Sequence, residues 1–179
     1  NSKLTSLNTS TLVNLETLNI YSSKITEIDL SHNPRLKSLN VQWACLESLD
    51  VSHNNELEEL NARYLDDLTN YSLELKNHPR LETVDLYASK FTQLDVTGCP
   101  NLYYLSCYFN NLTELDLSKC EKLEYLDCYY NSLTELDLTA NKNLIELNCS
   151  SNKLTSLDLH ACMKLRKLDF SGNLLTEVN

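Results

Sequence analysis

The aromatic residues are the side chains of this sequence best suited to binding another molecule. Tyrosine and tryptophan offer large, rigid apolar surfaces with a polar tip, and they are enriched at the centres of protein interfaces. The chain has ten tyrosines and one tryptophan, most of them at outward positions of LxxLxLxx segments. The sequence therefore predicts a partner-binding surface formed by Trp43, Tyr64, Tyr87, Tyr104, Tyr108, Phe109, Tyr125, Tyr129 and Tyr130.

The spacing of these rings predicts their arrangement. Segments aligned on their first leucine place the rings in columns, with neighbours one strand spacing apart. Cross-strand stacking that only stiffens a sheet is the alternative, at about 0.2–1 kcal/mol per pair. We favour binding, because exposed aromatic patches are uncommon without a use. We expect one contiguous patch of Tyr104, Tyr108, Phe109, Tyr125, Tyr129 and Tyr130, with Gln42, Arg63, Asp85 and Asp127 as polar neighbours.

A second regular set of residues is acidic. Its members hold the outward position of the LDL segments, so like charges should stack and raise one another's pKa. Calcium is one interpretation, but calcium-binding repeats use glycine-rich turns and this chain has two glycines. We expect a solvated face whose carboxylates accept hydrogen bonds from serine and threonine. The set is Asp29, Asp50, Glu74, Asp95, Asp116, Asp137 and Asp158.

The cysteines predict neither a metal site nor a disulfide framework. Seven cysteines cannot all pair with one another. No two of them stand two to four residues apart, as in zinc sites. Three hold an inward apolar position and three a turn position, where cysteine behaves as a small buried hydrophobe. We expect buried free thiols at Cys99, Cys107, Cys120, Cys128, Cys149 and Cys162.

No catalytic pattern emerges from the remaining polar residues. The sequence contains no Walker loop, no HExxH and no GxSxG. Carboxylate pairs for glycoside cleavage could come from the acidic set, but its uniformity singles out no pair. A non-enzymatic protein without a cofactor is therefore predicted. The histidines all lie in or next to turns, at His32, His53, His78 and His160.

An internal repeat must position all of these residues. Each repeat has the form LxxLxL, and a period of 20–29 residues of this kind indicates one solenoid coil per repeat. The period is 21 residues except between coils three and four, where it is 24, which predicts a loop near residues 66–72. Stacked coils share one core, so we expect a single domain over residues 1–179. Coils one to eight begin at Leu15, Leu36, Leu57, Leu81, Leu102, Leu123, Leu144 and Leu165.

The pattern within each repeat predicts a mostly β solenoid. Both halves of a repeat carry LxxLxL, with leucine or cysteine alternating with polar residues as in a strand. We expect parallel strands on the concave face, short strands or extended turns on the convex face, and little or no α-helix. At about 4.8 Å per strand, eight coils give a gently curved rod roughly 40 Å long.

An asparagine closes the first turn in the later coils, at Asn110, Asn131, Asn152 and Asn173. An inward amide can hydrogen-bond turn backbone groups that would otherwise be buried without partners. The earlier coils carry serine, alanine or leucine there. Leu65 of coil three cannot form such bonds, so we expect irregularity in that coil.

Charge and hydropathy limit the classes of partner that the chain could bind. A net charge of −10 argues against nucleic acid and anionic membranes, which favour basic surfaces. No apolar run approaches the roughly 20 residues needed to span a bilayer. Residues 1–10 do not resemble a signal peptide, although a removed signal would leave the same start. Neither end shows a polar cap, so we expect the chain to be part of a longer protein.

The motif LxxLxCxxNxLTxLDLSxNxx from Leu102 onward resembles the nested 21-residue class of bacterial leucine-rich repeats, and more distantly the internalins. That resemblance implies a protein-binding module that is secreted or held at a bacterial cell surface. Three alternatives stay open: a carbohydrate-binding surface module, a polysaccharide-cleaving solenoid, and a structural spacer within a larger surface protein.

Overall fold

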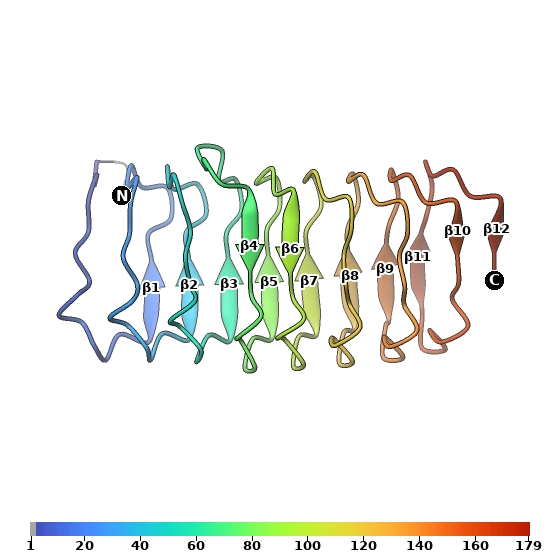
Figure 1. Cartoon of the computed structure of the whole chain (residues 1–179), viewed down its shortest axis with the longest axis horizontal. Helices are drawn as coiled ribbons and strands as arrows, with labels where there is room; N and C mark the ends of the chain where they lie inside the picture. The colour runs from blue at the N-terminus through green and yellow to red at the C-terminus, as the bar shows by residue number, and fades with distance from the viewer. Residues whose placement is uncertain (1–2) are drawn as a thin grey trace.

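Each first-half LxxLxL segment forms a three-residue strand in the computed structural model, which describes residues 3–179 (Figure 1). Leucines pair with leucines in register, as in Leu39 with Leu60 and Leu105 with Leu126. The eight strands make one parallel sheet along the rod. They are β1 (Thr17–Asn19), β2 (Ser38–Asn40), β3 (Glu59–Asn61), β5 (Thr83–Asp85), β7 (Tyr104–Ser106), β8 (Tyr125–Asp127), β9 (Glu146–Asn148) and β11 (Lys167–Asp169).

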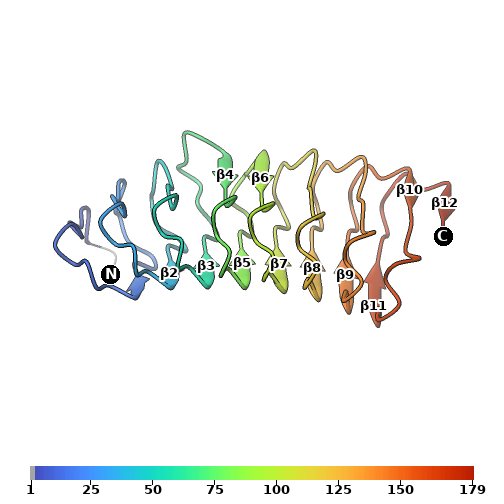
Figure 2. The ribbon, with the colours of Figure 1, turned by 60° about the horizontal axis from the view of Figure 1, so that its bottom comes forward.

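The second halves of the coils form shorter and less continuous structure on the opposite face (Figure 2). β4 (Ser72–Glu74) pairs with β6 (Gln93–Asp95), and β10 (Ser156–Leu157) pairs with β12 (Glu177–Val178). The other second halves are extended without strand pairing, and residues 3–179 contain no helix. The predicted fold class is therefore confirmed. Since the described chain has no helix, it has none that could cross a membrane.

A single line of apolar side chains runs through the stack between the two faces. Leu36, Leu57 and Leu81 are among many leucines with no exposed surface. Cys107 and Cys128 lie in the same line, fully buried, and every cysteine is a free thiol. Burial raises the pKa of the Cys99 and Cys120 thiols to about 12, so they stay protonated at neutral pH. The predicted buried thiols are thus confirmed.

The asparagine of the first turn joins each later coil to the coil before it. Asn152 Nδ2 donates to the carbonyls of Cys128 and Cys149 at 2.9 and 3.1 Å, and its Oδ1 accepts from the N–H of Leu133 at 3.0 Å. The structural role predicted for this residue is confirmed. In coil four Ser89 acts similarly, since its hydroxyl donates to the Ala62 carbonyl at 2.7 Å.

The second turn contains a residue whose role the sequence did not reveal. His78 is 1% exposed, and its Nε2 lies 3.0 Å from the Val51 carbonyl oxygen. Asn54 and Cys99 hold the corresponding positions of the neighbouring coils and donate to equivalent carbonyls. His78 is therefore a buried turn residue. His78 lies 24 residues after Asn54, which equals the longer period between coils three and four. This spacing is the sequence signal that His78 holds the turn position of Asn54.

The predicted loop near residues 66–72 lies just before β4 and stands out from the edge of the stack (Figure 1). It is anchored rather than free, because Leu68 is 3% exposed and Thr69 N–H donates to the Glu47 carbonyl at 2.8 Å. Farther along coil three the backbone of Lys76 passes close to Gly98. A Cβ on Gly98 would lie 1.8 Å from the Lys76 carbonyl oxygen, so this position requires glycine.

Candidate functional site

Seven rings form a continuous ladder beside the carboxyl ends of the strands of the eight-stranded sheet. Trp43 stacks on Tyr64 with ring centroids 3.8 Å apart, and Tyr64 meets Tyr87 edge-on at 4.7 Å. Tyr87 stacks on Tyr108 at 4.1 Å. Such contacts fall in the range where aromatic pairs attract one another. The aromatic ladder comprises Trp43, Tyr64, Tyr87, Tyr108, Phe109, Tyr129 and Tyr130.

The ladder includes bulky residues in an unfavourable backbone conformation. Trp43, Tyr64, Phe109 and Tyr130 have φ angles between +53° and +59°. A side chain with a Cβ is disfavoured in this left-handed region by about 1–2 kcal/mol, which is why glycine or asparagine usually occupies it. Gly172 holds the equivalent position in coil eight, with φ +66°. The four rings thus stand at a turn position where glycine would have the lower conformational free energy.

The rings nevertheless divide into two groups, which corrects the expectation of one contiguous patch. Tyr104 and Tyr125 contact each other at 6.4 Å, on β7 and β8. None of the ring contacts among residues 3–179 joins this pair to the ladder. The third residues of the strands, Asp85 and Asp127 among them, separate the two groups. The site is therefore two aromatic walls with a polar column between them.

Asp85 and Asp127 occupy equivalent positions in this polar column but have different partners. Asp85 is 13% exposed at its side chain and forms an ion pair with the Nη2 atom of Arg63. Asp127 accepts a hydrogen bond from the Tyr129 N–H at 3.1 Å and has no cationic partner anywhere in residues 3–179. Burial raises the pKa of Asp127, and repulsion from Asp85 adds to this.

The sheet is hollowed next to Asp127. A cavity of about 370 Å³ extends from β7 to β11, bounded by Tyr104 and Tyr125 at one end. Sequence analysis did not include Glu146, Asn148 and Lys167, which also line it. These three residues hold the same outward strand positions as the predicted tyrosines and aspartates. Their place in the repeat could therefore have identified them from the sequence as lining residues.

Three tyrosine hydroxyls near the polar column, those of Tyr64, Tyr104 and Tyr108, have raised pKa values and are neutral at physiological pH. A hydrogen bond with Tyr87 is the main cause that raises the pKa of Tyr64 to about 12. Burial raises the pKa of both Tyr104 and Tyr108. Neutral hydroxyls can both donate and accept hydrogen bonds, so they add polar recognition to the apolar faces of the rings.

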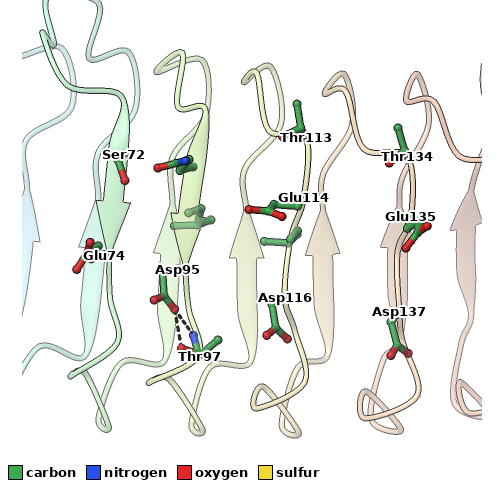
Figure 3. A pocket seen from close by; sticks show the side chains of 13 residues that line it. Ser72, Glu74, Asp95, Thr97, Thr113, Glu114, Asp116, Thr134, Glu135 and Asp137 are labelled. Atoms are coloured by element: carbon green, nitrogen blue, oxygen red, sulfur yellow. Dashed lines mark hydrogen bonds between the residues drawn. The ribbon is translucent and has the colours of Figure 1, made fainter.

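The acidic set lies on the other face of the solenoid, as predicted. Figure 3 shows Asp95, Asp116 and Asp137 on successive coils, with Asp95 hydrogen-bonded to Thr97. Each caps its own turn, for example by accepting from the Ser118 N–H at 2.9 Å in the case of Asp116. Those hydrogen bonds lower the pKa of Asp116 and Asp137. Repulsion from Asp116 and Asp158 does raise the pKa of Asp137, as expected, but the turn hydrogen bonds outweigh it and the net shift is downward.

The remaining titratable groups of the described chain form no metal site. No group of three or more His, Cys, Asp or Glu residues is placed to hold a metal ion within residues 3–179. His32 and His53 each contact the serine before them, and His160 Nδ1 lies 2.7 Å from Asp158 Oδ1. These histidines serve local turns, while the two aromatic walls are suited to binding.

Comparison with known proteins places the chain among repeat proteins. A family model described as Leucine Rich repeats (2 copies) matches residues 142–179. The functional domain of InlJ from Listeria monocytogenes, which includes a cysteine ladder, is similar over 99% of this chain and 48% of its own length, with 32% identity and a TM-score of 0.76. No match was found among curated proteins.

Two further solved structures share the fold. The internalin inlF from Listeria monocytogenes matches 99% of this chain and 58% of its own length, with 18% identity and a TM-score of 0.79. The ectodomain of the Arabidopsis thaliana receptor kinase GASSHO1/SCHENGEN3 matches 97% of this chain and 24% of its own, with 23% identity and a TM-score of 0.68. The chain thus spans about half the length of the InlJ domain and less than two thirds of the inlF structure.

Proposed function

Because the chain is a leucine-rich-repeat solenoid with internalin-like neighbours, we propose that it is a non-enzymatic module that binds a protein partner through the aromatic ladder and the Tyr104–Tyr125 pair. Leucine-rich repeats commonly mediate protein binding. The GASSHO1/SCHENGEN3 ectodomain, for example, was solved in complex with CASPARIAN STRIP INTEGRITY FACTOR 2. The Listeria neighbours support a location outside the cell or on a bacterial surface, where the module would act in ligand recognition or adhesion.

The left-handed aromatic residues carry this proposal. If ring stacking served stability alone, its gain of about 0.5–1.5 kcal/mol per pair would largely be offset by the conformational penalty of about 1–2 kcal/mol. Trp43, Phe109 and Tyr130 are also 46%, 39% and 54% exposed, so burial contributes less than it would in a core. Exposed rings that add little net stability are best explained by contact with a partner.

Two variants test this proposal. In the double variant Phe109→Gly/Tyr130→Gly, relief of the left-handed backbone at both positions offsets part of the loss of their ring contacts, so the variant should still fold. Tyr103→Ser is the matched control, because Tyr103 is 39% exposed but precedes β7 and makes no ring contact within the described chain.

The measurement is selection from a phage-displayed peptide library on the immobilised wild-type chain. We expect the selected peptides to lose at least tenfold in affinity for the double glycine variant and less than twofold for Tyr103→Ser. Equal binding to all three proteins would contradict the proposal and favour a spacer.

Carbohydrate recognition is the second candidate, and the polar hollow beside Tyr104 and Tyr125 favours it. An aromatic platform flanked by carboxylates and amides also suits sugars. A glycan array probed with the wild-type chain distinguishes the two functions. Glycan signal that disappears with Tyr125→Ala, together with no selected peptide, would replace the protein partner by a glycan. Release of shortened oligosaccharides from the array would instead indicate an enzyme.

A further inference from the structure

The third strand residue is asparagine in four coils and aspartate in three. Its side-chain Oδ1 accepts the N–H two residues ahead in both cases, at 3.0 Å for Asn40 and 3.1 Å for Asp127. An amide therefore forms this turn as well as a carboxylate does. The negative charge of Asp127 has no structural role in its own coil, although burial makes the charge unfavourable.

An ion pair within the chain shows that an aspartate in this column of third strand residues can bind an arginine. Asp85 pairs with Arg63, and the positive charge of Arg63 is close enough to Tyr104 and Tyr108 to act on them. Arg63 is the sixth residue after the first leucine of the preceding coil. At Asp127 the corresponding residue of the preceding coil is Tyr108, and no arginine of residues 3–179 forms an ion pair with this carboxylate.

The surroundings of Asp127 complete a place for a cation. Tyr104 and Tyr125 form one wall, and aromatic rings attract cations within about 6 Å of their centroids. Lys167, which also lines the adjacent hollow, is paired with Glu146 at 2.7 Å. Asp127 lines this hollow, and its Oδ2 accepts no hydrogen bond from residues 3–179.

We propose that Asp127, beside the Tyr104–Tyr125 pair, receives an arginine side chain of the protein partner, in the way that Asp85 receives Arg63 within the chain. The proposal rests on the protein-binding function above and specifies the chemistry of the partner. Arginine suits the site better than lysine, because its planar guanidinium stacks on aromatic rings while donating to a carboxylate. The net charge of −10 complements a basic segment.

The test uses two synthetic peptides, acetyl-(Gly-Arg)₃-amide and the neutral analogue in which citrulline replaces each arginine. Binding is followed by NMR through the ring signals of Tyr104 and Tyr125. We expect saturable shifts with the arginine peptide only. Asp127→Asn should weaken this binding at least tenfold, and it should fold normally because Asn148 holds the same position in coil seven.

Asp116→Asn is the matched control, since it removes the same charge from a residue that caps a turn on the opposite face. Its arginine-peptide affinity should stay within twofold of wild type. Equal losses for both variants would show general attraction to an acidic protein and overturn the proposal. Equal binding of the citrulline peptide would also overturn it. If no arginine peptide binds while library peptides still require the ladder, the cation site is wrong and the protein-binding function stands.

Discussion

Asp127 and Asp116 each cap a turn with the same backbone hydrogen bond, yet their surroundings move their pKa values in opposite directions. Burial on the sheet face raises the pKa of Asp127. Hydrogen bonds with Ser118 lower the pKa of Asp116 on the exposed face. A raised carboxyl pKa means that the folded state is more stable when the group is protonated, and a lowered pKa means the reverse.

Replacing each aspartate by asparagine should reveal this difference. A group with a raised folded pKa loses stability as pH rises through that value, so Asp127→Asn should be more stable than wild type at pH 7. Asp116→Asn should be slightly less stable than wild type at pH 7. Both differences should shrink as pH falls through the folded pKa of each residue. Urea unfolding at several pH values measures this, and a less stable Asp127→Asn at pH 7 would show that its charge supports the fold.

At the level of the coil, the turn asparagine is the element that holds neighbouring coils together. Asn152 is 6% exposed and uses both amide atoms on the backbone of two neighbouring coils, at Cys128 and Leu133 of coil six and at Cys149 of its own coil. Stacked parallel strands supply the remaining backbone hydrogen bonds. Removing the amide would leave several buried carbonyl and N–H groups without partners.

Asn152→Ala should therefore destabilise the protein by about 2–4 kcal/mol, as expected for two or three unsatisfied buried groups. Asn111→Ala is the control, because Asn111 is exposed and its single side-chain hydrogen bond is 3.4 Å long. We expect that control to change stability by less than about 0.5 kcal/mol. Chemical denaturation followed by far-UV circular dichroism compares the two, and similar losses would contradict the role assigned to the buried amide.

The whole molecule carries a net charge of −10, with carboxylates on both faces of the rod. Equivalent positions recur at about the strand spacing of 4.8 Å, well within the Debye length of about 30 Å at 0.01 M salt. Repulsion therefore acts along the stack at low salt and is screened at about 0.15 M, where the Debye length is about 8 Å.

Raising NaCl from 0.01 to 0.15 M should increase the melting temperature by a few degrees, since about 1 kcal/mol corresponds to about 2–4 °C for a chain of this size. CaCl₂ and MgCl₂ at equal ionic strength should have equal effects, because no three-ligand cluster exists in residues 3–179. Thermal melts by circular dichroism provide the check. A larger rise with calcium alone would indicate a specific calcium site in the acidic set.

Local spacing was enough to predict the scaffold of the site. Leu105 and Cys107 had to face inward, and Asn110 had to close the turn, because the strand period and backbone hydrogen bonding are short-range constraints that repeat in every coil. The same spacing assigned Tyr104, Tyr108 and Phe109 to outward columns, and the structure places them there.

The sequence by itself thus determined the coil, the buried thiols and the identity of the outward residues. Only the tertiary structure decided which outward residues meet. It divided the rings into two walls and placed Phe109 in the left-handed region. It also paired Arg63 with Asp85, while Asp127 has no cationic partner among residues 3–179. The physical reason is that a repeat constrains each coil alike, whereas contacts between columns depend on side-chain direction, local burial and the particular residue in the preceding coil.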